Sequence, residues 1–429
     1  MTSGAPASEL PDPAGISPIR DASWYAGGPV LWQTASLRYG GVNRQVMANA
    51  CVFQDFGIPL SLLCDDMGPE EGRDFNLPLA RGLFTEIVVL TKQLGDRSLY
   101  AAALEYCRRF PALPDIKRQV LAIYMAFFLH IRPRVAQIWN GDHVLPALAA
   151  VLAGVPHVLS CARSQPPNQR APYGYESTNP ESAYDAFHFM LNFPSFALAA
   201  NSIPGCRGYE RWLGMPEGSV IHTPNAFSPQ EWPEPSQKAV AALRHRIGLP
   251  EGAPLISGVM RFATIKDPLL WLECVGAALA AMPDAHAALF GDGEMEQFIL
   301  SALKRLPARE RIHVFPPVRD AGIVYAASSA FLLTSHIEGL PNVLLEAAYH
   351  RVPVVTTPAG GAPEAVKDGV SGFVVGSREP RRIADKLLYI LDNPDWARKA
   401  GEAGRALVTG KFSPRKTARV FADLYADWE

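Results

Sequence analysis

The feature that most constrains the fold of this chain is a regular alternation of short apolar runs with longer helical patterns. The short runs are rich in Val, Ile and Leu, which is typical of strands that are buried on both faces of a parallel sheet. Their alternation with helices predicts stacked βαβ units. We therefore expect an α/β fold with two Rossmann-like, doubly wound domains facing across a cleft, which the carboxyl ends of their strands would line.

The two halves of the sequence each supply six candidate strands. In the first half we expect strands at 29–33, 59–63, 86–90, 135–139, 157–160 and 197–201, and helices at 42–56 and 115–131. In the second half we expect strands at 254–260, 285–290, 312–315, 330–334, 352–356 and 372–375, and helices at 269–281, 294–303, 342–350 and 380–391.

A Pro- and Ser-rich stretch at 228–237 marks the boundary between the two halves. We predict a first domain at 27–228 and a second at 229–411. Residues 1–26 are rich in Pro, Ser, Gly and Asp and are expected to form a disordered lead-in. A final helix within 412–429 either crosses back to the first domain or stays on the second, and the pattern does not choose between them.

Composition excludes several classes of protein. The 429 residues carry 40 basic and 42 acidic side chains, so a nucleic-acid-binding surface is not expected. Six scattered cysteines without a C-x-x-C pair predict reduced thiols in a cytoplasmic protein, not a disulfide frame or zinc site. The most apolar run, 144–162, is interrupted by Pro146 and Pro156 and is better explained by a buried helix and strand than by a membrane span.

The strongest local signal, Glu338 to Glu346, directly follows a predicted strand. Gly339 permits a tight turn and Pro341 suits the first helical position, so the amides of 342–344 would form an anion site at a helix N-terminus. Glu346 shares a helix face with that turn and can accept hydrogen bonds from vicinal hydroxyls, such as those of a ribose. Glu338 can bind further hydroxyls. Alternatively, Glu346 is a solvated helix residue and Glu338 an ordinary loop acid.

A second signal is a pair of cations, Arg261 and Lys266, five residues apart just past a predicted strand. Arg can bridge two oxygens as a fork and Lys adds a point charge, so the pair suits a diphosphate. Neutralising the charge of a diphosphate leaving group lowers the barrier to its departure. Alternatively, Lys266 pairs with Asp267 and both are solvated.

Together these motifs resemble those of the retaining GT-B glycosyltransferases of family GT4, and the resemblance covers nearly all of the second half. It implies that Arg261 and Lys266 hold the donor diphosphate, that Glu338 binds the donor sugar and that Glu346 binds the ribose. The base would lie near Val318. The phosphates or the sugar would contact the backbone of Gly339, Leu340, Pro341, Asn342 and Val343. No metal and no cofactor is implied, because the nucleotide-sugar is a substrate.

The resemblance is weaker in the first half. Residues 36–50 look like the Gly-Gly loop of the family, in which Gly40 and Gly41 would let the backbone approach the donor phosphates and Arg44 would add a charge. Alternatively, the glycines only make a tight strand–helix turn. Many relatives have a histidine after the strand that corresponds to 157–160, where this chain reads Ser-Cys-Ala-Arg. His143 is either a replacement catalytic imidazole or structural, and Arg163 is a candidate for binding an anionic acceptor.

The resemblance thus implies a retaining glycosyltransferase that uses a nucleoside-diphosphate sugar, with UDP favoured. A glycan or lipid-linked glycan of a bacterial surface polysaccharide is the leading acceptor. The alternatives are a soluble-sugar synthase or phosphorylase of the same fold, or a non-catalytic sugar-nucleotide-binding assembly partner.

The segment 107–134 carries six cations and one acid among aromatic residues, a net charge of +5. It is either an amphipathic surface helix with buried aromatic side chains or a membrane-docking surface. The second interpretation would place the protein at the inner face of the cytoplasmic membrane.

Overall fold

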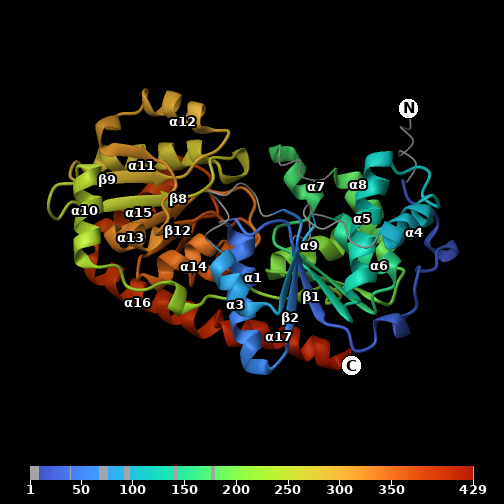
Figure 1. Ribbon diagram of the computed structural model, residues 1–429. Coiled ribbons are helices and arrows are strands. Elements are labelled where there is room, and N and C mark those ends of the chain that lie inside the picture. The colour runs from blue at the N-terminus through green and yellow to red at the C-terminus, as the bar shows by residue number, and fades with distance from the viewer. Residues whose placement is uncertain are drawn as a thin grey trace, which may run out of the picture. The chain divides into compact units, whose positions relative to one another are not determined.

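The computed structural model describes residues 9–38, 40–66, 76–90, 97–139, 144–174 and 179–428. These residues form two compact units. Unit 1 comprises the described residues up to Ala171, those from 179 to Ala226, and those from Pro414 onward; unit 2 comprises 172–174 and Phe227–Ser413. Each unit is built on one sheet (Figure 1).

Unit 1 contains a parallel sheet in the order β3-β2-β1-β4-β5-β6-β7. Its strands are β1 Val30–Thr34, β2 Leu60–Cys64, β3 Glu86–Val89, β4 Val135–Ile138, β5 His157–Ala162, β6 Phe196–Ala200 and β7 Ile221–His222. The six predicted strands are all present. The seventh, β7, was not predicted because two half-buried residues at the sheet edge leave no apolar run.

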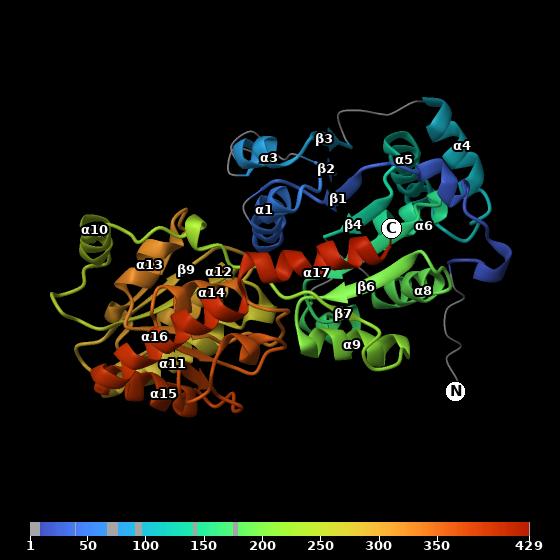
Figure 2. The same cartoon turned by 90° about the horizontal axis from the view of Figure 1, so that it is seen from below.

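Helices cover both faces of this sheet. They are α1 Gly41–Phe53, α3 Leu77–Leu83, α4 Arg97–Cys107, α5 Asp115–Ile131, α6 Val144–Ala153, α7 Pro167–Arg170, α8 Pro180–Met190, α9 Ile203–Leu213 and α17 Pro414–Asp427. One core joins the sheet to α4, α5, α6, α8 and α9. The other joins it to α1, α3 and α17, and Figure 2 shows α17 beside α1.

The last helix thus belongs to unit 1. Its Tyr425 is buried, accepts a hydrogen bond from Trp32 Nε1 at 3.1 Å and donates one to Gln137 on β4. Phe421 packs edge-on against Trp139. Of the two alternatives for the C-terminal helix, the structure therefore has the one in which the helix crosses back to the first domain.

The expectation of a disordered lead-in is wrong for residues 9–26. This segment contains two short 3-10 helices, Pro13–Gly15 and Ala22–Tyr25. Tyr25 is fully buried and donates a hydrogen bond to the carbonyl of Ala153, and the amide of Ile19 donates one to Leu152. A few apolar residues that pack against α6 are enough to hold this segment in place, although its overall composition is polar. Residues 1–8 lie outside the described residues.

Unit 2 contains a six-stranded parallel sheet in the order β10-β9-β8-β11-β12-β13. Its strands, β8 Leu255–Val259, β9 His286–Phe290, β10 Ile312–Phe315, β11 Ala330–Leu333, β12 Val354–Thr356 and β13 Gly372–Val374, are all among those predicted. Its helices are α10 Gln237–Ile247, α11 Pro268–Ala281, α12 Glu296–Leu303, α13 Ala321–Ala327, α14 Asn342–Tyr349, α15 Pro380–Asp392 and α16 Pro394–Lys411. The α/β fold class with two Rossmann-like sheets is confirmed.

The basic segment 107–134 buries its aromatic residues. Tyr124, Phe127 and Phe128 on α5 are at most 5% exposed. Arg118 donates hydrogen bonds to carbonyls of the 110–113 turn, and Arg132 lies over the Trp24 ring. The segment therefore matches the interpretation of an amphipathic helix with a buried aromatic face. Within the described residues, no helix combines the length and the hydropathy that a membrane crossing requires.

Candidate active site

The carboxyl edge of the second sheet brings Lys266 and Glu338 together. Lys266 lies in a 3-10 turn, Thr264–Lys266, that follows β8, and Glu338 lies in the loop that follows β11. The Lys266 ammonium donates to Glu338 Oε1 at 2.6 Å, and the Ser335 hydroxyl donates to the same oxygen at 2.6 Å. The two side chains are 27% and 8% exposed, respectively. Lys266 therefore pairs with Glu338, not with Asp267.

A second cation, which the sequence did not single out, connects these two loops. Arg378 follows β13 and donates to Asp267 Oδ2 at 2.6 Å. It also donates to the carbonyls of Thr334 and Ser335 at 2.8 and 3.1 Å. Asp267 has a left-handed backbone (φ 47°) and caps α11 through Leu270 N. Arg378 thus fixes the residue after Lys266 and the residues that lead to Glu338.

An aromatic stack lies beside this network. His336 Nε2 is 3.2 Å from Asp267 Oδ2, and its ring stacks on Tyr173 with centroids 4.4 Å apart. Burial lowers the pKa of His336, the nearby Arg378 lowers it further, and Asp267 opposes both. At neutral pH the imidazole is therefore uncharged and can exchange a hydrogen bond with Asp267. A cation a few residues after a strand end could have indicated Arg378. No signal in the sequence indicated Tyr173, which is distant along the chain.

Arg261 lies in the loop directly after β8, is 58% exposed and pairs with Glu294 at 3.2 Å. Close backbone packing shapes this loop: Phe262 N donates to Asp292 O, and Met295 N donates to Phe262 O. A Cβ on Gly291 would lie 1.9 Å from the carbonyl oxygen of Met260, so only glycine fits there. The Arg261 guanidinium stays accessible to a ligand.

Helix α14 begins at Asn342, so Pro341 is its N-cap and not its first helical residue. The extended ψ of Pro341 (114°) keeps it outside the helix. Pro341 makes no side-chain cap hydrogen bond, and the positive end of the helix dipole lies at the first turn of α14. One turn later, Glu346 is 4% exposed and accepts a hydrogen bond from Tyr325 at 2.7 Å. The interpretation of Glu346 as a solvated residue is therefore wrong.

The remaining predicted donor residues lie near strand ends but in less enclosed places. Val318 follows β10 and is half-buried against the core. In unit 1, Gly40 caps α1 with an extended backbone (φ 172°), and Gly41 is the exposed first residue of that helix. Arg44 is half-buried one turn along, and its amide donates to Gly40 O. A tight strand–helix turn accounts for this geometry as well as a phosphate site does.

Arg163 directly follows β5 in unit 1. It donates to Asn225 Oδ1 and lies over the Trp139 ring, with 5.3 Å from its Cζ to the centroid. Its Nη1 atom is buried and has no hydrogen-bond partner among the described residues. Burial lowers the pKa of Arg163 to about 10. A partly buried guanidinium that has no carboxylate partner among the described residues is an energetically costly arrangement, which an anionic ligand would relieve.

The predictions for His143 and for the absence of a metal are not tested by this geometry. His143 lies outside the described residues. In those that are described, no group of three or more His, Cys, Asp or Glu side chains is placed to hold a metal ion.

Comparisons with known proteins agree with the fold and match the second half of the chain to a known family. Residues 240–407 match the family described as Glycosyl transferases group 1. A relative from Salmonella typhi, the Vi polysaccharide biosynthesis protein VipC/TviE, is 27% identical over 83% of this chain and 65% of its own length. The D-inositol 3-phosphate glycosyltransferase of Segniliparus rotundus is 30% identical over 42% of this chain and 41% of its own length. The chain thus spans less than two thirds of either relative.

Among solved structures, Anabaena Alr3699/HepE in complex with UDP-glucose superposes with a TM-score of 0.72 at 17% identity. The superposition covers 93% of this chain and all of that one. At this identity the likeness establishes the fold, which is GT-B.

Proposed function

We propose that this protein is a retaining glycosyltransferase that uses a nucleoside-diphosphate sugar, since its residues 240–407 match the family described as Glycosyl transferases group 1. The observation that carries this proposal is the Lys266–Glu338 pair in unit 2, in which Glu338 lies in the loop that leads to the N-terminus of α14. A cation, a carboxylate and a set of helix amides are the groups that a diphosphate and a sugar require.

Each group has a role in donor binding. Lys266 and the exposed Arg261 neutralise the diphosphate, while the backbone from Gly339 to Val343 approaches the phosphates or the sugar. Glu338 accepts hydrogen bonds from sugar hydroxyls. Glu346, which Tyr325 already orients, accepts from the ribose. Val318 lies near the base, and the Gly40–Gly41 turn with Arg44 supports the phosphates from unit 1.

The reaction is a front-face substitution. The bond between the anomeric carbon and the diphosphate oxygen breaks, and the acceptor oxygen bonds to the same face of that carbon. The acceptor proton passes to the departing phosphate, and the electron pair of the broken bond stays on that phosphate. Lys266 and Arg261 stabilise its charge. His143 is the alternative proton acceptor, and no metal or cofactor takes part in the scheme.

We favour a UDP-sugar as the donor, and the complex of the structurally similar Anabaena protein with UDP-glucose supports this choice. A surface polysaccharide is supported by the relative named for Vi polysaccharide biosynthesis. The acceptor is a glycan or a lipid-linked glycan that carries an acidic group, and Arg163 binds that group, since its buried Nη1 atom has no hydrogen-bond partner among the described residues. We place the enzyme in the cytoplasm, with peripheral contact to the inner face of the membrane through 107–134 as a further part of the proposal.

The test is donor turnover by Glu338→Ala and Lys266→Ala, with Lys238→Ala on the exposed face of α10 as the control. We expect at least a hundredfold slower UDP release in the first two variants and a normal rate in the control. Wild-type rates in both site variants would refute the assignment. Dependence of turnover on orthophosphate would identify a phosphorylase, and donor binding without turnover would identify a non-catalytic binder.

A further inference from the structure

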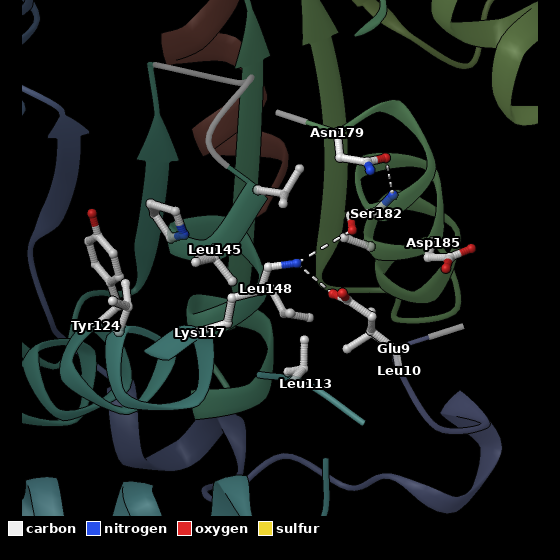
Figure 3. Close-up of a pocket in the computed structure, with 14 residues that line it drawn as sticks. Glu9, Leu10, Leu113, Lys117, Tyr124, Leu145, Leu148, Asn179, Ser182 and Asp185 are labelled. Carbon is white, nitrogen blue, oxygen red and sulfur yellow. Dashed lines mark hydrogen bonds and ion pairs between the residues drawn. The ribbon is translucent and has the colours of Figure 1, made fainter. Parts of the chain in front are cut away.

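Unit 1 contains a partly open pocket of about 340 Å³ that the glycosyl-transfer scheme does not use (Figure 3). It is lined by the N-terminal halves of α5, α6 and α8 and by Glu9 and Leu10. Helices in a parallel α/β layer run opposite to the strands, so their first turns lie at the carboxyl edge of the sheet, where ligands of this fold class bind. We propose that this pocket binds a single-chain amphipathic anion.

The wall is mainly apolar. It is formed by Leu113, Val120, Tyr124, Val144, Leu145, Pro146, Leu148 and Ala186. Leu148 and Tyr124 are 1% and 5% exposed, so these side chains are fixed by the core and the space between them is preformed. A methylene group takes up about as much space as a liquid water, about 30 Å³. The cavity therefore has room for an alkyl chain of roughly ten carbons.

The apolar lining also contains a cationic side chain, Lys117. The Lys117 ammonium donates to Glu9 Oε2 at 2.6 Å and to Ser182 Oγ at 3.4 Å, and Figure 3 shows it pointing from α5 toward both. Ser182 lies in the first turn of α8, whose dipole also favours an anion there. The pocket thus already contains the carboxylate of Glu9, next to the apolar side chain of Leu10. A carboxylate beside an apolar group is also what an amphipathic anion would present.

Glu9 is a replaceable occupant. The ion pair is about one third exposed on both sides, and exposed pairs of this kind add little to stability. Without Glu9, the lining carries one cation, Lys117, and one acid, Asp185. A monoanion that replaces Glu9 keeps the charge of this lining as it is, whereas a doubly charged head would add a second negative charge beside Asp185. The site therefore suits a monoanion, either a carboxylate or a phosphodiester, at the end of the alkyl chain.

The experiment is calorimetric titration of the full chain, without any sugar donor, so its outcome is independent of glycosyl transfer. The probes are decanoate and methyl decyl phosphate as monoanions, with decanol and decyltrimethylammonium as neutral and cationic counterparts. We expect both monoanions to bind at least tenfold more tightly than the other two. A preference for only one monoanion identifies which head, carboxylate or phosphodiester, the site takes.

Two variants move affinity in opposite directions if the proposal holds. Lys117→Gln should weaken decanoate binding at least tenfold and abolish its advantage over decanol. Glu9→Gln should tighten it severalfold, because the competing carboxylate is gone. Arg108→Gln, an exposed residue outside the pocket, should leave it unchanged. Absence of binding, equal binding of all four probes, or unchanged affinity in both pocket variants would overturn the proposal.

Discussion

At the scale of single residues, the candidate site depends on a carboxylate that is almost fully buried from solvent. Glu338 is 7% exposed and accepts hydrogen bonds from both an ammonium and a hydroxyl. A buried carboxylate of this kind needs such partners, because desolvation is not otherwise compensated. The pair therefore serves stability before any ligand arrives, and a donor must exchange hydrogen bonds with it.

This arrangement predicts how the pair contributes to stability. Lys266→Met leaves Glu338 without its cation and should lower the free energy of unfolding by about 1–3 kcal/mol. Glu338→Gln should cost a similar amount, and the double variant should cost clearly less than the sum, because neither charge is then left alone. Urea unfolding measures all three. Strict additivity would mean that the two side chains do not interact.

Arg378 is predicted to act by positioning. Arg378→Met frees Asp267 and two carbonyls of the loop before Glu338, so donor turnover should fall at least tenfold. Arg381→Met makes the same charge change three residues later on an exposed position and should keep turnover within twofold of wild type. Steady-state UDP release compares them. Equal effects of the two variants would assign the loss to net charge alone.

At the scale of elements, α14 joins the donor site to the core. Its first turn faces the proposed donor, Glu346 bonds to Tyr325, and it ends at His350. His350 is 8% exposed and stacks on Tyr325. Burial is the main cause that lowers its pKa, with Arg405 and Arg351 adding to the effect and Glu234 and Asp320 opposing it.

Acidification should therefore weaken unit 2. The unfolded chain binds a proton at His350 near pH 6.5, whereas the folded chain binds it only at lower pH, so stability is complete above pH 6.5 and falls as the pH drops below it. His350→Phe keeps an aromatic ring in the stack and removes the proton. Its loss of stability between pH 7.5 and 5.5 should be smaller, by at most about 1.4 kcal/mol per pH unit. Parallel pH profiles would contradict the role given to His350.

Many of the secondary-structure elements and site loops were predictable from the sequence. Apolar runs locate all twelve expected strands because strands buried on both faces leave an unbroken signal, whereas the two-residue β7 leaves none. The Lys266 and Glu338 loops were predictable because each follows such a run. Arg378, His336 and Tyr173 were not identified, since their roles arise from contacts between segments far apart in the chain. The ion-pair partner of Lys266 could not be predicted either, because the sequence pattern left open whether Lys266 pairs with Asp267 or binds a ligand.

At the scale of the whole molecule, the last helix completes the first unit. Tyr425 on α17 links Trp32 on β1 and Gln137 on β4, about 290–390 residues earlier in the chain. The burial of Tyr425, Phe421 and Ala418 makes one of the two cores of unit 1 depend on the C-terminal helix. Folding of the first unit is therefore complete only when α17 has packed on the sheet.

Tyr425→Phe tests this dependence. It keeps the ring but leaves Trp32 Nε1 and Gln137 without their hydroxyl partner, so unit 1 should lose about 1–3 kcal/mol of stability. Tyr389→Phe, at a 43% exposed position in unit 2, is the matched control and should change little. Urea unfolding followed by tryptophan fluorescence reports the difference. Identical midpoints for the two variants would show that α17 does not support unit 1 in this way.

The central claim is that unit 2 binds a nucleoside diphosphate through Lys266 and the α14 N-terminus. Calorimetric titration with UDP and UMP tests it most directly, because the two ligands differ by the phosphate that these groups hold. We predict that the wild type binds UDP at least tenfold more tightly than UMP, and that Lys266→Met loses most of this difference. No binding of UDP, GDP or ADP, or an undiminished preference for UDP in Lys266→Met, would contradict the claim.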